Sequence, residues 1–244
     1  MNVFLAGATG VIGRRLSLLL IADRHAVTGT TRSRTKAAQL RSSGVTPLVI
    51  DVFDGGALRD AVVLARPDIV IHQLTDLAGP LDPSRREEML ARNARLRMEG
   101  TLNLVAAAVA AGARRLIAQS IAFAYAEGAE LHAETDPLAS GKGGPGAVTA
   151  RGVRALEEAV LHASGIEGIV LRYGRLHGPG TWNERATGRA PLHVDAAAQA
   201  ARLAVAHGAA GIYNIAEDDG AVSIAKARRE LGFDPAFRIS ATVS

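Results

Sequence analysis

The 244-residue sequence contains no cysteine, few aromatic residues and no apolar run of membrane-spanning length. The absence of cysteine excludes disulfide bonds and thiolate catalysis. The absence of a run of about 20 apolar residues predicts a protein without a transmembrane helix. A strand-like pattern begins at residue 2, which leaves no room for a secretory leader. We therefore expect a cytoplasmic protein with no membrane partner.

Lysine is also scarce, so arginine carries almost all of the positive charge. The formal net charge is +4, and the only lysines are Lys36, Lys142 and Lys226. The arginines are scattered along the chain, whereas nucleic-acid-binding proteins usually gather them in one stripe. The pattern argues against a nucleic-acid partner and suits a phosphate-bearing ligand.

Short apolar runs alternate with longer helical patterns through most of the chain. Several of the runs, such as VFLAG, are continuously apolar, as expected of strands that are covered on both faces. Strand–helix alternation predicts an α/β protein with a doubly wound parallel sheet, the Rossmann fold. The expected strands are 3–6, 26–30, 47–50, 69–71, 115–119, 168–171 and 211–215. The expected helices are 11–23, 34–43, 55–65, 84–111, 149–164 and 194–207.

The first strand leads into a glycine-rich turn, GATGVIG. Its glycines are spaced Gly7-x-x-Gly10-x-x-Gly13 and are followed by an amphipathic helix. In a dinucleotide site the first glycine permits the turn, the second lets a pyrophosphate approach, and the third lets the helix pack on the strand. The N-terminus of the helix then offers free N–H groups to the phosphates. The context predicts a dinucleotide-binding turn.

The second strand lacks the carboxylate that an NAD site usually places at its end. Residues 28–34 read TGTTRSR, and Arg32 stands where Asp or Glu would bind the ribose 2′-hydroxyl. A guanidinium pairs with a 2′-phosphate. The sequence therefore favours NADP over NAD. After the third strand, Asp51 either meets the adenine or caps the next helix, for which Asp54 is the better candidate.

Six segments together resemble the extended short-chain dehydrogenase/reductase family, and more narrowly its NAD(P)-dependent epimerase/dehydratase branch. They are GATGVIG, VID at 49–51, IHQLT at 71–75, SIAFAY at 120–125, LRYGRLHGPGTW at 171–182 and HVDAAAQA at 193–200. The resemblance implies one Rossmann-type domain over 1–244. A reduced C-terminal substrate lobe would be formed by about 174–192 and 216–244. The resemblance also implies a homodimer built through helices 84–111 and 149–164.

The resemblance also assigns roles to individual residues. Ile12 would lie beside the pyrophosphate that Gly7, Gly10 and Gly13 approach. Asp51 and Val52 would border the adenine, and Leu74 and Thr75 would line the nicotinamide ribose. Ser120 would occupy the position of the family's catalytic serine.

One further absence concerns the chemistry itself. The family's Tyr-x-x-x-Lys pair, which moves the hydroxyl proton, is missing from the helix after the serine. Anchoring on Glu157 places Thr149 and Val153 at the two positions, and a shift of one residue gives Ala150 and Arg154. The chain offers other groups that could substitute: Tyr125 or Tyr173 as the acid, and Lys142 as the ammonium.

Two histidines invite a metal interpretation, which the sequence does not favour. His177 and His193 have no ligand partner at metal-binding spacing. Near His193, Asp195 is the residue expected to cap the following helix.

Two functions remain open at this point. The first is an NAD(P)-dependent oxidoreductase of the epimerase/dehydratase type, acting on a small or sugar-like hydroxy or carbonyl substrate. The second is a non-catalytic NADP-binding sensor or scaffold derived from such an enzyme. The glycine turn is compatible with both functions. The retained Ser120 favours the first, and the missing dyad favours the second.

Overall fold

A computed structural model describes residues 1–77, 83–128, 131–140 and 144–240 of the chain. Its centre is a seven-stranded, entirely parallel sheet with the order β3-β2-β1-β4-β5-β6-β9. The strand order reverses direction between β1 and β4, which defines the crevice where open α/β sheets bind ligands. The strands are β1 (Asn2–Ala6), β2 (Ala26–Thr31), β3 (Thr46–Val49), β4 (Ile69–His72), β5 (Arg115–Ile121), β6 (Glu167–Tyr173) and β9 (Gly211–Ile215).

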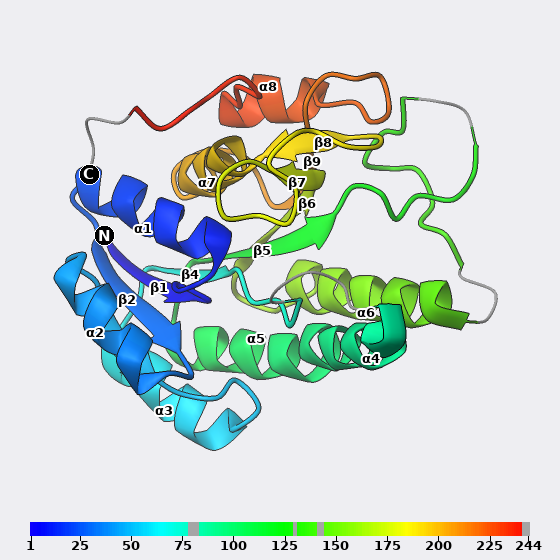
Figure 1. Cartoon of the computed structure of the whole chain (residues 1–244). Coiled ribbons are helices and arrows are strands. Elements are labelled where there is room, and N and C mark those ends of the chain that lie inside the picture. The colour runs from blue at the N-terminus through cyan, green and yellow to red at the C-terminus, as the bar shows by residue number, and fades with distance from the viewer. Residues whose placement is uncertain (78–82, 129–130, 141–143, 241–244) are drawn as a thin grey trace.

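Helices cover both faces of this sheet, so the predicted doubly wound fold is confirmed (Figure 1). On one face lie α1 (Val11–Ala22), α7 (Val194–Leu203) and α8 (Ala225–Leu231), with α2 (Arg34–Ser42) near the sheet edge. On the other face lie α3 (Gly55–Ala65), α4 (Arg86–Arg95), α5 (Thr101–Ala110) and α6 (Gly144–Leu161). Each face has its own hydrophobic core, because alternate strand residues point to opposite sides. Phe4 packs in one core and Leu5 in the other.

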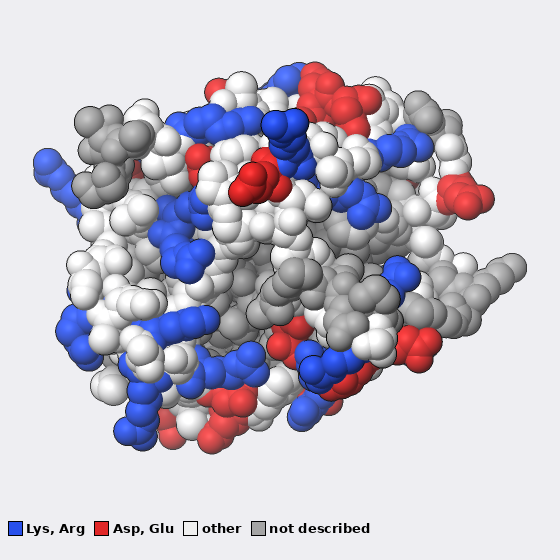
Figure 2. All heavy atoms as spheres, viewed as in Figure 1, with Lys and Arg blue, Asp and Glu red and all other residues white. Residues whose placement is uncertain are grey.

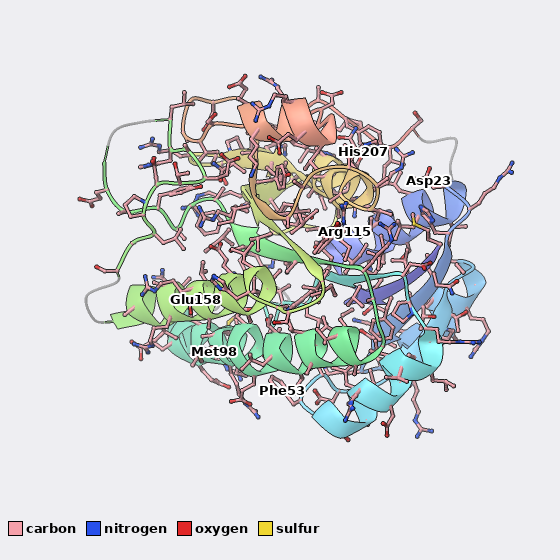
Figure 3. All side chains as sticks on the ribbon, turned by 180° about the vertical axis from the view of Figure 1, so that it is seen from behind. Asp23, Phe53, Met98, Arg115, Glu158 and His207 are labelled. Atoms are coloured by element: carbon pink, nitrogen blue, oxygen red, sulfur yellow. The ribbon has the colours of Figure 1, made fainter. Side chains whose placement is uncertain are left out.

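The predicted helix 84–111 is interrupted in the structure. A short 3₁₀ turn (Pro83–Arg85) precedes α4, and a π-helical turn, η2 (Leu96–Gly100), joins α4 to α5. Helices α4 and α6 run side by side (Figures 1 and 3), because Gly152 leaves room for Ala94. A Cβ on Gly152 would lie 3.0 Å from the Ala94 Cα. The predicted helix 149–164 begins earlier, at Gly144, since Pro145 is tolerated in a first helical turn.

Two short strands that the sequence did not predict form a separate parallel pair, β7 (Arg175–His177) and β8 (Pro191–His193). They lie in the segment expected to form part of a small C-terminal lobe. The Glu217 N–H donates to Pro191 O at 2.7 Å, and Asp219 accepts from the Ala190 N–H at 2.7 Å. The segments near 174–192 and 216–220 are therefore hydrogen-bonded to each other.

Buried and surface charges follow different patterns. Arg115, at the start of β5, donates to the carbonyls of Ala204 and His207 and so ties the sheet to the end of α7 (Figure 3). On the face shown in Figure 2, Lys and Arg side chains are spread over several elements and mixed with acidic ones.

Within the described ranges, no helix has the length and apolar character needed to cross a bilayer.

Candidate dinucleotide site

The turn between β1 and α1 requires glycine at two of the three positions of its Gly-x-x-Gly-x-x-Gly motif, Gly7 and Gly13. Gly7 has φ +91°, and a Cβ there would lie 2.6 Å from the Gln73 carbonyl oxygen. A Cβ on Gly13 would lie 2.1 Å from the Gly7 carbonyl oxygen. The Gly7 N–H donates to Thr30 Oγ1 at 3.1 Å, and the Gly10 N–H donates to Gly7 O at 3.0 Å. The turn is thus tightly fixed against β2 and β4.

The N-terminus of α1 is open to an anionic ligand. Gly10 is its N-cap, and no side chain among the described residues caps it. By contrast, Ser33 caps α2 and Asp54 caps α3, as predicted for Asp54. The uncapped N–H groups and the helix dipole favour a phosphate at this end of α1. Ile12 is buried just inside the helix.

β2 ends without a carboxylate of its own, and an exposed arginine, Arg32, follows it. The Arg32 side chain is 67% exposed, and its nearest carboxylate is Asp76 at 3.6 Å. Asp76 is already bound by Arg92 at 3.0 Å. The first turn of α2, which follows Arg32, contains no acidic residue. This end of the site is therefore suited to a negatively charged group.

After β3, Asp51 and Val52 differ in their exposure to solvent. Asp51 is exposed and accepts from the Phe53 N–H at 3.0 Å. Val52 is buried, and the Gly100 position packs beside it. Asn103 from α5 donates to Val52 O at 2.9 Å and fixes this connection.

The segment after β4 is held by side chains from two other elements. Gln119 of β5 donates to Leu74 O at 3.0 Å. Asn93 of α4 accepts from the Thr75 hydroxyl at 3.1 Å. Leu74 is half-buried and Thr75 is exposed, so both lie at the carboxyl edge of the sheet beside the glycine turn.

His72, the last residue of β4, is buried and uncharged. Burial, with a smaller contribution from the charge of Arg97, lowers its pKa to about 4. Its Nδ1 accepts from the Leu74 N–H at 3.2 Å, so its Nε2 carries the proton and donates to Thr101 Oγ1 at 3.0 Å. A neutral His72 thus fixes the start of the segment that contains Leu74.

The hydroxyl of Ser120 belongs to a buried ionic network. It donates to Glu157 Oε1 at 2.6 Å, and Arg172 binds both oxygens of Glu157, at 3.0 and 2.7 Å. All three residues are buried. Tyr125 joins the network, because its hydroxyl accepts from Arg172 at 2.8 Å and donates to Asn214 Oδ1 at 2.7 Å. Burial raises the pKa of Tyr125.

Tyr173 lies apart from that network, on the other face of the sheet. It packs in the core beneath α1 and α7, and its hydroxyl accepts from Gln73 Nε2 at 3.2 Å. Burial raises the pKa of Tyr173 far above that of a free tyrosine. The structure therefore brings Ser120 and Tyr125 together but leaves Tyr173 separate. Gln73 Oε1 is buried without a hydrogen-bond partner among the described residues.

The helix α6 places no acid–base pair at the expected positions. Val153, where the family's lysine would be, is fully buried. Thr149 is partly exposed. Arg154 turns to the preceding loop, donating to Ala139 O at 2.9 Å. Lys142 lies outside the described residues.

Arg97, a cation that no sequence motif marks as part of the site, lies on the π-helical turn η2. Burial lowers its pKa to about 10, and the charge of Glu157 opposes that change. The same positive charge depresses the pKa of His72. Arg97 is thus a half-buried cation whose charge acts both on His72 at the end of β4 and on Glu157 of α6. The sequence alone gave no signal, because Arg97 reads as one of several charges on a long surface helix.

The residues around the turn fit a dinucleotide. The glycine cradle, the uncapped helix and the unpartnered Gln73 Oε1 all leave interactions that a bound ligand would complete. Together with the sheet order, they define a Rossmann-type dinucleotide-binding protein.

Comparison with known proteins identifies the family. The model of the NAD dependent epimerase/dehydratase family matches residues 3–211, and the chain belongs to this family. It is an NAD(P)-binding, epimerase/dehydratase-like oxidoreductase.

Individual relatives agree with this assignment. The chain is 44% identical over 232 residues to a Streptomyces protein named 3-diazoavenalumate denitrifying reductase, covering 94% of this chain and 72% of that one. UDP-glucose 4-epimerase of Thermotoga maritima, solved with UDP-glucose, shares the fold with a TM-score of 0.76 at 19% identity, covering 98% and 94% of the two chains. The Bordetella bronchiseptica enzyme WbmG, solved with NAD, has a TM-score of 0.73 at 18% identity, covering 100% and 91%.

Proposed function

We propose that this chain is an NADPH-dependent denitrifying reductase, which replaces a cationic aryl diazonium group by hydrogen on a small carboxylate substrate. The Streptomyces relative carries this activity in its name and aligns with nearly the whole chain. The observation that carries the proposal is the missing proton-transfer dyad, with Val153 buried at the lysine position.

The chemistry of denitrification explains why a dyad is not needed. The C–N bond of the diazonium carbon breaks, dinitrogen leaves with the bonding electron pair, and the carbon gains a hydride supplied by a reduced nicotinamide. A cation and a hydride give two neutral products, so no proton is taken up or released. Reduction of a carbonyl group instead requires a proton on oxygen, and therefore a positioned acid. A site without tyrosine and lysine suits the first reaction and not the second.

The chain's own residues bind and orient the reactants, which is how a protein serves a cofactor reaction. Gly7, Gly10, Gly13 and the start of α1 would hold the pyrophosphate, while Leu74 and Thr75 would border the nicotinamide ribose. Ile12 supports the turn from within α1.

The three residues first considered catalytic are better assigned as positioning residues. The hydroxyls of Ser120 and Tyr125 are both committed to the Glu157–Arg172 network. Through it they hold the segment that follows β5 against β6 and β9. The hydroxyl of Tyr173 accepts a hydrogen bond from the Gln73 side chain. High pKa values make Tyr125 and Tyr173 poor proton donors.

The cofactor preference that we propose is NADP over NAD. Arg32 stands exposed after β2, and residues 28–34 contain no carboxylate to repel a 2′-phosphate. The nearby Asp76 pairs with Arg92 at 3.0 Å as well as with Arg32 at 3.6 Å, so its charge is shared between two arginines. Asp51 and Val52 would border the adenine on the neighbouring strand. To test this, Arg32→Ala is compared with Arg41→Ala at the far end of α2. We expect only Arg32→Ala to weaken NADPH binding while leaving NADH binding unchanged. An unaltered ratio of the two affinities would remove Arg32 from this role.

A non-catalytic NADP-binding protein remains the second candidate, since it is also compatible with the missing dyad. Turnover distinguishes the two. The purified protein is mixed with NADPH and 3-diazoavenalumate, and NADPH oxidation is followed together with the product mass. A reaction without protein measures the spontaneous rate. The reductase predicts product in amounts equal to the NADPH consumed. Tight NADPH binding without any product above the spontaneous rate would establish the sensor instead.

A further inference from the structure

An exposed arginine and an exposed phenylalanine meet at the carboxyl edge of the sheet. Phe123 follows β5, and Arg175 follows the neighbouring strand β6 after a single glycine. The Arg175 guanidinium carbon lies 4.4 Å from the centre of the Phe123 ring. The ring remains 43% exposed. Parallel α/β sheets bind their ligands at this edge.

The backbone beneath the two side chains is firmly held. The Arg175 N–H donates to Ala190 O at 2.7 Å, and the Ala122 N–H donates to Tyr173 O at 2.8 Å. A Cβ on Gly174 would lie 2.2 Å from Ala190 O, so only glycine allows this close approach of 174 to 190. Arg175 is consequently presented from a rigid support, as a preorganised binding group requires.

Arg175 differs from the other arginines that stack on aromatic rings, Arg95 and Arg172, in having no ion-pair partner among the described residues. Within the described parts of the chain, no carboxylate lies within salt-bridge distance of it. Arg95 provides the comparison, since it also stacks on a phenylalanine, Phe53, at 4.2 Å. The charge of Arg95, however, is paired with Glu99 at 2.8 Å. The stacked Arg175 thus keeps a charge without a carboxylate partner, beside the carboxyl ends of β5 and β6.

We propose that Arg175 and Phe123 bind the substrate itself: Arg175 pairs with its carboxylate, and Phe123 packs on the adjoining flat, conjugated chain. This rests on the proposed function in taking the substrate to be a carboxylate. A guanidinium binds a carboxylate through two parallel N–H···O bonds, and an aromatic face favours a flat apolar partner. The ligand class is therefore a planar, conjugated carboxylic acid, of which the diazo carboxylate is one example.

The test uses a ligand that cannot react, so that it does not depend on turnover. Calorimetry measures the binding of 4-coumarate and of its methyl ester to the protein saturated with NADP⁺. We expect the acid to bind more tightly than the ester, because the ester has lost the charge. Arg175→Ala should weaken acid binding by roughly ten- to a hundredfold, the effect of a charge-assisted hydrogen bond. Phe123→Leu should weaken the acid and the ester alike.

The controls separate the alternatives. Arg95→Ala should leave 4-coumarate binding unchanged, and NADP⁺ binding by every variant shows that the site remains folded. Equal binding of acid and ester, equal binding by wild type and Arg175→Ala, or no binding of 4-coumarate would each overturn the proposal. Binding of UDP-glucose that depends on Arg175, in place of 4-coumarate binding, would assign the residue to a pyrophosphate and also overturn it. Failure to release dinitrogen from a diazo substrate would contradict the proposed function alone.

Discussion

Neutral His72 makes the stability of this protein sensitive to acid. In the folded chain its pKa is about 4, against 6.5 for a free histidine. Between these values the unfolded chain binds a proton that the folded chain excludes, so the free energy of unfolding falls as the pH is lowered. The full contribution is present above pH 6.5 and is lost progressively toward pH 4. The shift corresponds to about 3 kcal/mol in total, of which about 2 kcal/mol is lost by about pH 5.

Urea denaturation at about pH 7.5 and about pH 5 measures this effect. Other groups titrate over the same range, so the informative quantity is the difference between wild type and His72→Gln. Glutamine keeps an N–H to donate to Thr101 but does not titrate. We expect the variant to be less stable at neutral pH and to lose about 2 kcal/mol less on acidification. The same loss of stability in both proteins would show that His72 is not the group responsible.

Three further predictions follow from the site. Gly13→Ala should abolish NADPH binding, because its Cβ would lie 2.1 Å from the Gly7 carbonyl oxygen. The control variant Gly56→Ala, whose Cβ would have no neighbour closer than 3.8 Å, should bind NADPH normally. Titration of NADPH fluorescence measures both. Glu157→Gln removes the buried partner of Arg172 and should lower the free energy of unfolding by about 3–5 kcal/mol in urea denaturation; a loss below about 1 kcal/mol would contradict the account of the pair. The proposed reaction moves no proton, so kcat should stay flat from about pH 6.5 to about pH 9, and a bell-shaped profile would reveal an acid that the structure does not provide.

The fold was predictable because its signals are local. Strands covered on both faces are continuously apolar, and each predicted strand lies within two residues of an observed one. Asp54 also caps its helix as expected, since a cap depends on the few residues that follow it. The glycine turn could be placed because φ and close approach at Gly7 and Gly13 are fixed by neighbouring elements that the alternation already implied.

The features that escaped prediction depend on contacts between distant residues. The expectation that Asp195 caps α7 is wrong: His193 is the cap, and Asp195 is bound by Arg15 from α1 at 2.6 Å. The strands β7 and β8 are only three residues long and carry no pattern of their own. The pairing of Phe123 with Arg175 arises only once β5 and β6 lie side by side.

The roles of tyrosine and serine could not be read from the sequence for the same reason. Ser120 resembles a catalytic serine in its local sequence, but its side chain is on the α6 face, where it donates to Glu157, which Arg172 also binds. Tyr173 is one residue from Arg172 and points to the opposite face, as neighbours in a strand must. Whether a hydroxyl is free for chemistry depends on these tertiary partners.

The central claim is direct delivery of hydride to the carbon that loses dinitrogen. Its most direct test supplies NADPH deuterated at the transferable position of the nicotinamide, in ordinary water, with 3-diazoavenalumate as substrate. Mass spectrometry and NMR then locate the label in the product. We predict one deuterium at the carbon that carried the diazo group. A product that takes this hydrogen from water, or no product above the spontaneous rate, would contradict the claim.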